Sequence, residues 1–289
     1  MRTTDHRKGV LLCFSGGMLL GFDVLLLRLS RTDAWTAMAW RGAMIFIVLF
    51  LFWLLMRALH RPVAPFINGW PGLLVSLLYG AGSVLFMLAV HRTTTANLVF
   101  LLAFMPMFAA LFSWVFLSEN ISRSALLTLV AALAGIMIIV WDGMERGSLS
   151  GDLMALSVAI CMAAALTLTR WCGRDLSLSP AMGQLVSSLF AMMIVIPAAP
   201  GAFAFGWLAL NGLLVVPLAL AFLALGPRYL PAPEVAMFFL LESVLAPFWV
   251  WLFLGEEASI ASLIGGAIVI TAILAHSLWQ LKHAPKTEY

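Results

Sequence analysis

The sequence predicts an all-α integral membrane protein of ten transmembrane helices, arranged as two inverted repeats of five. Composition, the spacing of apolar runs and an internal duplication lead to this prediction. Of the 289 residues, 63% are hydrophobic and 10% are charged, whereas about 25% of residues are charged in an average soluble domain. Such a chain cannot cover a water-soluble surface, and its apolar content leaves no room for a soluble domain between the spans.

The spans are predicted from apolar runs bounded by charged or turn-forming residues. They cover residues 9–27, 34–56, 71–91, 96–117, 122–141, 150–170, 178–200, 206–226, 233–254 and 259–281. The first run exceeds the roughly 7 to 15 residues of a signal-peptide core, and further spans follow it directly. We therefore expect it to remain in the protein as the first helix.

The distribution of basic residues predicts the orientation, because Lys and Arg in short loops stay on the cytoplasmic side. With the N-terminus inside, the inner segments contain Arg2, Arg7, Lys8, Arg57, Arg61, Arg123, Arg170, Arg174, Arg228, Lys282 and Lys286. The outer loops contain only Arg28, Arg31, Arg92 and Arg146. We therefore predict a multi-pass protein of the cell (inner) membrane with both termini in the cytoplasm.

An internal duplication appears when the chain is shifted by 137 residues. The shift lays Trp114, Phe116, Leu117, Ser118 and Glu119 over Trp251, Phe253, Leu254, Gly255 and Glu256, and Ser122 over Ser259. Each match ends an apolar span, which divides the chain into repeats at residues 1–143 and 144–289. Since five spans is an odd number, the second repeat must enter the membrane in the opposite sense.

The span ends that carry this duplication resemble a known family. Phe253-Leu254-Gly255-Glu256, and less perfectly Phe116-Leu117-Ser118-Glu119, are similar to the span ends of EamA-type ten-helix exporters in the drug/metabolite transporter superfamily. The resemblance covers essentially the whole chain. Within the superfamily, the chain is similar to bacterial amino-acid exporters, the aromatic branch included. It implies export of amino acids with broad specificity by alternating access, with export of other small metabolites or drugs as the alternative.

Charges inside predicted spans are the sharpest functional signals, because each costs about 2.5 to 3.5 kcal/mol at a helix centre on insertion scales. Glu242 lies near the middle of the ninth span, where it either binds a substrate amine or a proton, or makes a buried hydrogen bond to a neighbouring helix. Asp23 and Arg41 lie in the first two spans, whose short connection makes them antiparallel neighbours. We expect these two to form either a fixed ion pair or a gate.

Further candidate residues for substrate binding lie on helical stripes of the third, fourth, sixth and ninth spans. They are Tyr79, Ser83, Asn97, Leu101, Met105, Met162 and Phe238. Pro106 and Pro247 predict that the fourth and ninth spans are interrupted near mid-membrane, which in transporters marks a binding site. The other interpretation of such stripes is helix packing.

The sequence lacks the patterns that are typical of metal-binding, redox and nucleotide-binding proteins. The five histidines lie at termini or span ends without a metal-binding pattern, the three cysteines have no metal or redox spacing, and no lysine sits in a nucleotide-binding loop. We predict no catalytic residue, no metal site and no cofactor, and the scattered basic residues predict no nucleic-acid partner. The expected partners are the lipid bilayer and a small-molecule substrate moved by secondary or passive transport; monomer and homodimer are both open. A non-transporting scaffold or receptor is the rival class.

Overall fold

The computed structural model describes residues 3–61, 64–93, 98, 101–119, 122–141, 148–197, 199–254 and 260–283, and its regular secondary structure there is entirely helical. The first half contains α1 (Thr3–Leu20), α2 (Asp23–Ser30), α3 (Ala34–Ala58), α4 (Gly69–Arg92), α6 (Met105–Leu117) and α7 (Arg123–Trp141). The second half contains α8 (Leu149–Cys172), α9 (Ser179–Ile194), α10 (Ala202–Ala209), the π-helix η1 (Leu210–Val215), α11 (Val216–Leu225), the 3-10 turn η2 (Gly226–Arg228), α12 (Ala232–Leu254) and α13 (Ile260–His283). The predicted all-α class is confirmed.

Several of these helices have the length and composition of membrane spans. Five apolar segments of the described chain are long enough to cross a bilayer, namely His6–Ser30, Ala34–Ala58, Gly69–Ala89, Leu149–Cys172 and Ala202–Arg228. Shorter apolar helices are Met105–Leu117, Arg123–Ile138 and Ser179–Ile194. All of them coincide with predicted spans, which supports a multi-pass membrane protein; the number ten stays a prediction.

The surface of the helical bundle is apolar, as expected for contact with lipid. Met193 on α9 is 86% exposed and Leu127 on α7 is 72% exposed, whereas small residues such as Ala39, Ala159 and Ala163 are fully buried. Small buried residues let helix backbones approach closely, which is how membrane helices gain packing energy without a hydrophobic driving force.

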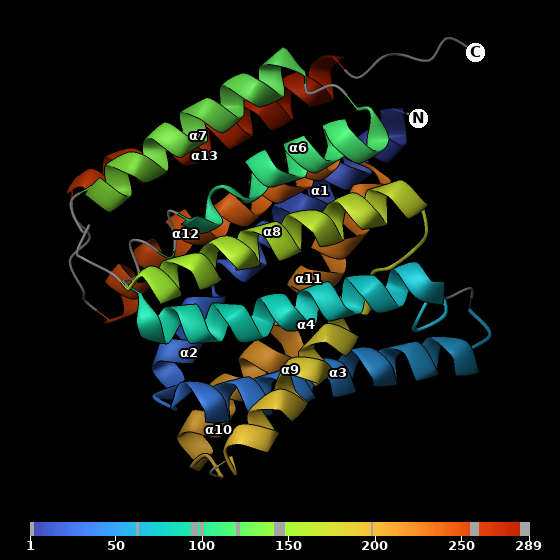
Figure 1. Cartoon of the computed structure of the whole chain (residues 1–289), viewed down its shortest axis with the longest axis vertical. Helices are drawn as coiled ribbons and strands as arrows, with labels where there is room; N and C mark the ends of the chain where they lie inside the picture. Colours follow the sequence, from blue (N-terminus) through green and yellow to red (C-terminus); the bar gives the residue numbers. More distant parts are fainter. Residues whose placement is uncertain are drawn as a thin grey trace.

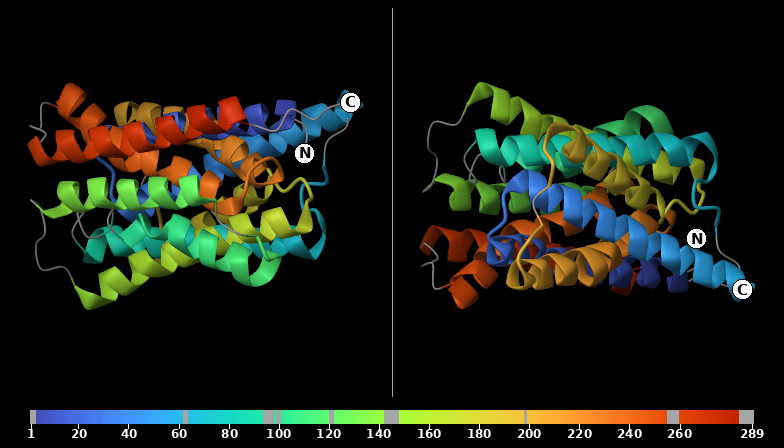
Figure 2. Two further views of the ribbon diagram at one scale, coloured as in Figure 1. Left: turned by 90° about the horizontal axis from the view of Figure 1, so that it is seen from above. Right: turned by 90° about the horizontal axis from the view of Figure 1, so that it is seen from below.

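The two halves of the chain interleave. The long helices α4, α7, α8 and α13 run along roughly one direction, with the start of α1 and the end of α13 at the same end (Figures 1 and 2). α4 packs on α8 and α9, and α11 with η1 makes the matching contacts on α1 and α3. α6 packs on α8 as α12 does on α1, while α3–α9, α6–α12 and α7–α13 pair each helix with its repeat counterpart. A two-fold axis that exchanges the halves would produce this pattern.

The helix interruptions differ in part from the prediction. α6 begins after a turn at Ala103 and Phe104, with Pro106 in its first turn. α12, however, is continuous from Ala232 to Leu254, so the predicted interruption at Pro247 is wrong. A proline is tolerated within a membrane helix when neighbouring groups satisfy the backbone carbonyl it frees.

Two interruptions occur at positions that the prediction did not mark. The first span breaks at Gly21 and Phe22, between α1 and α2, and the eighth span widens into η1. Gly21 lies close to α12, since a Cβ atom there would lie 2.6 Å from the Cβ of Leu245. π-Helical segments frequently occur at functional sites.

A close backbone approach between α4 and α9 provides a test of the packing. A Cβ atom on Gly183 would lie 2.6 Å from the Cβ of Tyr79 and 2.7 Å from the backbone oxygen of Ser76. We therefore expect Gly183→Ala to lower the free energy of unfolding by about 1 to 3 kcal/mol, because overpacking forces the helices apart. Gly206→Ala is the matched control, since nothing lies within 4 Å of a Cβ atom there. Equal thermal unfolding midpoints of the two variants in detergent would contradict the close approach.

Candidate functional site

A buried ion pair marks the break in the first span. Asp23 opens α2 directly after the break, and Nη2 of Arg41 on α3 lies 2.6 Å from its Oδ2. The side chains are 8% and 13% exposed respectively. The two residues that the sequence suggested as partners are therefore in direct contact.

Asn211 in η1 completes the surroundings of Asp23. Its Nδ2 donates to Oδ1 of Asp23 at 2.7 Å and to the backbone carbonyl of Asp23 at 3.2 Å, and the residue is fully buried. Gly212 allows η1 to approach α3, because a Cβ atom there would lie 3.2 Å from the backbone oxygen of Arg41. The sequence analysis missed Asn211, although an Asn-Gly pair inside an apolar run was the available signal.

Glu242 brings a third ionisable side chain to the same place from α12. It lies near enough to Asp23 and Arg41 to interact electrostatically with both. One turn before Glu242, the carbonyl of Phe238 contacts Gly17, and one turn after it Leu245 packs on Gly21. The face of α12 that carries Glu242 therefore faces the junction of α1 and α2.

Several polar atoms around this charged cluster (Asp23, Arg41, Asn211 and Glu242) lack partners. Within the described chain, Nε of Arg41 and Oδ1 of Asn211 are buried and have no hydrogen-bond partner. Nε1 of Trp249 is also buried without a hydrogen-bond partner in the described chain, and the Trp249 ring stacks on Phe22 with a centroid distance of 4.4 Å. Since buried polar atoms are rarely left unpaired, the cluster has donors and acceptors available for a bound molecule or water.

The other predicted residues fall into separate groups. Tyr79 is buried in the interface of α4 with α9, and Oγ of Ser83 on the same helix accepts a 3.0 Å hydrogen bond from Nε2 of Gln184. Met105 and Phe238 share the largest apolar cluster. Met162 packs against that cluster and against the one that contains Tyr79.

Of the two remaining predicted binding residues, Leu101 lies elsewhere and Asn97 is not among the described residues. Leu101 packs in a separate small cluster with Leu98 and Ala155. The structure therefore brings together Asp23, Arg41 and Glu242 most closely, and leaves the predicted apolar stripe divided.

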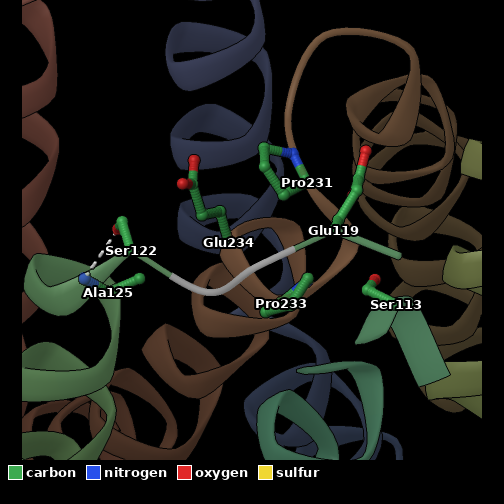
Figure 3. Close-up of a pocket in the computed structure, with 7 residues that line it drawn as sticks. All are labelled: Ser113, Glu119, Ser122, Ala125, Pro231, Pro233 and Glu234. Atoms are coloured by element: carbon green, nitrogen blue, oxygen red, sulfur yellow. Dashed lines mark hydrogen bonds between the residues drawn. The ribbon is translucent and has the colours of Figure 1, made fainter. Parts of the chain in front are cut away.

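A pocket of about 310 Å³ lies elsewhere, where α6 ends and α7 and α12 begin (Figure 3). It is lined by Ser113, Glu119, Ser122, Ala125, Pro231, Pro233 and Glu234. Oγ of Ser122 accepts a 3.1 Å hydrogen bond from the N–H of Ala125, which is an N-cap contact at the start of α7. None of the predicted binding residues that the structure describes lines this pocket.

Polar contacts near this pocket tie neighbouring helices together. Nη2 of Arg170 lies 3.0 Å from Oε1 of Glu119, and its Nη1 donates to the carbonyl of Pro227 in η2 at 3.3 Å. Nη1 of Arg228 lies 2.9 Å from Oδ2 of Asp175, in the loop between α8 and α9. The Arg170–Pro227 and Arg228–Asp175 contacts join η2, which follows α11, to α8 and to the loop after it.

The burial of the Asp23–Arg41 pair predicts a stability effect. We expect Asp23→Asn to lower the free energy of unfolding by about 3 to 5 kcal/mol, because it leaves a buried guanidinium without its counter-ion. Adding Arg41→Met should restore much of that loss, since the double variant no longer buries an uncompensated charge. Thermal unfolding of both variants in detergent measures the effect, and a double variant less stable than Asp23→Asn would contradict it.

Comparison with solved structures shows the fold. A solved structure titled only "Crystal structure of protein" superposes with a TM-score of 0.78 at 15% sequence identity, covering 94% of this chain and 98% of that chain. At that identity the similarity extends to the fold alone. No curated protein matches the chain.

Comparison with protein families shows what kind of protein has this fold. Residues 7–141 and residues 149–278 each match the EamA-like transporter family. Each match covers a set of helices that begins with α1 or α8, so the chain contains two EamA repeats. Together the two matches cover most of the sequence, and the chain belongs to the EamA-like transporter family, whose members are membrane transporters of small molecules.

Proposed function

We propose that this transporter exports zwitterionic amino acids, aromatic ones included, with broad specificity by alternating access. Membership of the family carries the general activity, transport of a small molecule through the membrane. The observation that carries the substrate class is the charged cluster of Asp23, Arg41, Asn211 and Glu242 inside apolar helices.

The charges of the cluster suit both ends of a zwitterion. Asp23 and Arg41 compensate each other, which leaves the carboxyl group of Glu242 without a counter-charge. An ammonium group beside Glu242 would compensate it, and a carboxylate could accept from the unpaired Nε of Arg41. An intramembrane charge is expensive unless it is paired, so binding energy is available when both groups of the substrate arrive.

Apolar residues near the cluster suit the remaining part of the substrate. Phe238 lies one turn from Glu242, and the Phe22–Trp249 stack is at the same helix junction. Met105 and Met162 belong to the packing around Phe238, and methionine adapts to ligands of varied shape. We propose that these side chains accept aromatic and aliphatic substrates alike, and that Tyr79 and Ser83 on α4 contribute to the same binding site.

The moving bodies are proposed to be mixed groups of helices. Rocking of one sequence half against the other would break the α4–α8, α4–α9 and α1–α11 contacts, which join the two halves, whereas mixed groups keep these contacts intact. One group contains α4, α6, α8 and α9, and the other contains α1, α2, α3, α10, η1, α11 and α12. The Arg228–Asp175 pair and the Arg170–Pro227 contact link these groups, and we propose that they close the cytoplasmic end.

Export of another metabolite or drug is the alternative, because the cluster would also accept a simple organic cation. An amine without a carboxylate tests it: faster flux of such amines than of amino acids would favour the alternative. A receptor or scaffold would move no solute at all.

Transport in liposomes tests the proposal directly. We expect purified protein to move amino acids such as phenylalanine and leucine, and Glu242→Gln or Arg41→Gln to reduce the initial rate by at least about tenfold, since each loses a charge-assisted contact. Ser157→Ala should leave the rate unchanged, because its hydroxyl donates only to the Leu153 carbonyl of its own helix. The panel is run with and without a proton gradient, and absence of flux for every amino acid would contradict the proposal.

A charge exchange tests the contact proposed to close the cytoplasmic end. We expect Asp175→Arg to change the flux because it places two like charges beside each other, and the double variant Asp175→Arg/Arg228→Asp to restore the original value because it re-forms the pair. Initial rates from the same liposome assay measure both. Failure of the exchange to restore flux, with both proteins folded, would show that the pair does not govern opening.

A further inference from the structure

Two unpaired hydrogen-bond donors lie at the break between α1 and α2. The ring of Trp249 on α12 stacks on Phe22 with a centroid distance of 4.4 Å, and Arg41 on α3 bonds the next residue, Asp23, through Nη2. Each of the two side chains keeps a buried donor that has no hydrogen-bond partner in the described chain, namely Nε1 of Trp249 and Nε of Arg41. Consecutive residues of the break therefore each contact a side chain with an unused donor.

The packing of Trp249 does not account for its N–H group. A phenylalanine at this position could stack on Phe22 in the same way and would bury no unpaired donor. A buried indole N–H usually has a hydrogen-bond partner, and an indole nitrogen can only donate. The N–H of Trp249 is therefore available to an acceptor on a bound molecule.

The backbone at the break offers donors of the same kind. The N–H of Phe22 donates to the carbonyl of Leu19, and the next bond across the break joins the N–H of Leu26 to the carbonyl of Phe22. In the part of the chain that the structure describes, no backbone hydrogen bond across the break uses the N–H groups between them. The Asp23 side chain bonds other helices and does not cap its own. These N–H groups lie at the positive end of the α2 dipole, which favours a negative charge.

A carboxylate matches these donors in charge and in hydrogen-bonding capacity. It has two acceptor oxygens and no donor, and the guanidinium of Arg41 has five donors, of which Asp23 takes one. The charge of Asp23 is compensated by Arg41 and Asn211, so it opposes a second carboxylate only weakly. In transporters with discontinuous helices, half-helix N-termini point at anionic groups of the substrate.

We propose that Nε1 of Trp249 donates a hydrogen bond to the carboxylate of the substrate and thereby selects molecules that carry this group. Arg41 and the start of α2 supply the positive potential. The ammonium group of the substrate is left to the acceptors of the charged cluster, Glu242 and the unpaired Oδ1 of Asn211. The inference adds a specificity-determining residue to the proposed function; its role in transport rests on that function, whereas the binding contact does not.

A single substitution removes the N–H and keeps an aromatic ring. We expect Trp249→Phe to weaken binding of phenylalanine to the purified protein by about tenfold to a hundredfold, because a hydrogen bond to a charged group is lost. Binding of phenethylamine, which has the ring and the ammonium but no carboxylate, should be unchanged. Isothermal titration calorimetry in detergent measures both ligands. Trp114→Phe on α6 is the matched control, since that side chain is 61% exposed on the outside of the bundle.

The pattern across the two ligands separates a binding contact from a packing role. Selective loss of phenylalanine binding in Trp249→Phe, with Trp114→Phe behaving like the unaltered protein, supports the inference. Equal weakening for both ligands would show that Trp249 acts only through packing, and unchanged phenylalanine binding would also overturn the inference. If Trp249→Phe does not fold, as judged by size-exclusion chromatography, the unaltered protein decides: it must bind phenylalanine more tightly than phenethylamine, and equal affinities overturn the inference.

Transport in liposomes distinguishes this inference from the proposed function. Phenylalanine binding that depends on Trp249, without flux of any amino acid, would refute export and leave the contact intact. Flux of phenylalanine and phenethylamine in the same ratio in Trp249→Phe as in the unaltered protein would support export and overturn the role of Trp249.

Discussion

A carboxylate buried among apolar helices organises the centre of this protein. Asp23 would be costly in such surroundings on its own, and its cost is offset by Arg41 from α3 and by Asn211 from η1. Each partner must reach the same point, which ties three segments of the chain to the break between α1 and α2. Glu242 then faces this arrangement from a fourth segment. Helix positions and the site therefore depend on a single electrostatic requirement.

Backbone proximity supports that requirement. Gly17 and Gly21 let α12 approach on both sides of Glu242, and Gly212 lets η1 approach Arg41. A side chain at any of these positions would separate the groups that must interact. In a bilayer, where apolar surface gains little by leaving lipid, such close contacts supply much of the association energy between helices.

The sequence predicts the fold better than the site. Apolar runs suffice to locate the helices, and the short connection after α2 is enough to place Arg41 beside Asp23, because neighbours along the chain must lie side by side. Asn211 could not be assigned, since its contact with Asp23 joins residues 188 positions apart and a single asparagine in an apolar helix carries no periodic signal. Pro247 misled the prediction because a proline interrupts a membrane helix only where neighbouring groups do not satisfy the freed carbonyl. The pocket of Figure 3 is lined by residues of helices that are distant in the sequence, which a local pattern does not encode.

The interleaved packing also has a consequence for biosynthesis. A chain leaves the ribosome from its N-terminus, yet α4 finds its main partners, α8 and α9, only in the second half, and α7 packs on α13, the last helix. Until the second repeat is inserted, the helix faces of the first repeat must therefore be covered by lipid or by insertion factors. Native packing closes only when the final helix has been inserted, so truncation of α13 would deprive α7 of its principal neighbour however complete the rest of the chain is.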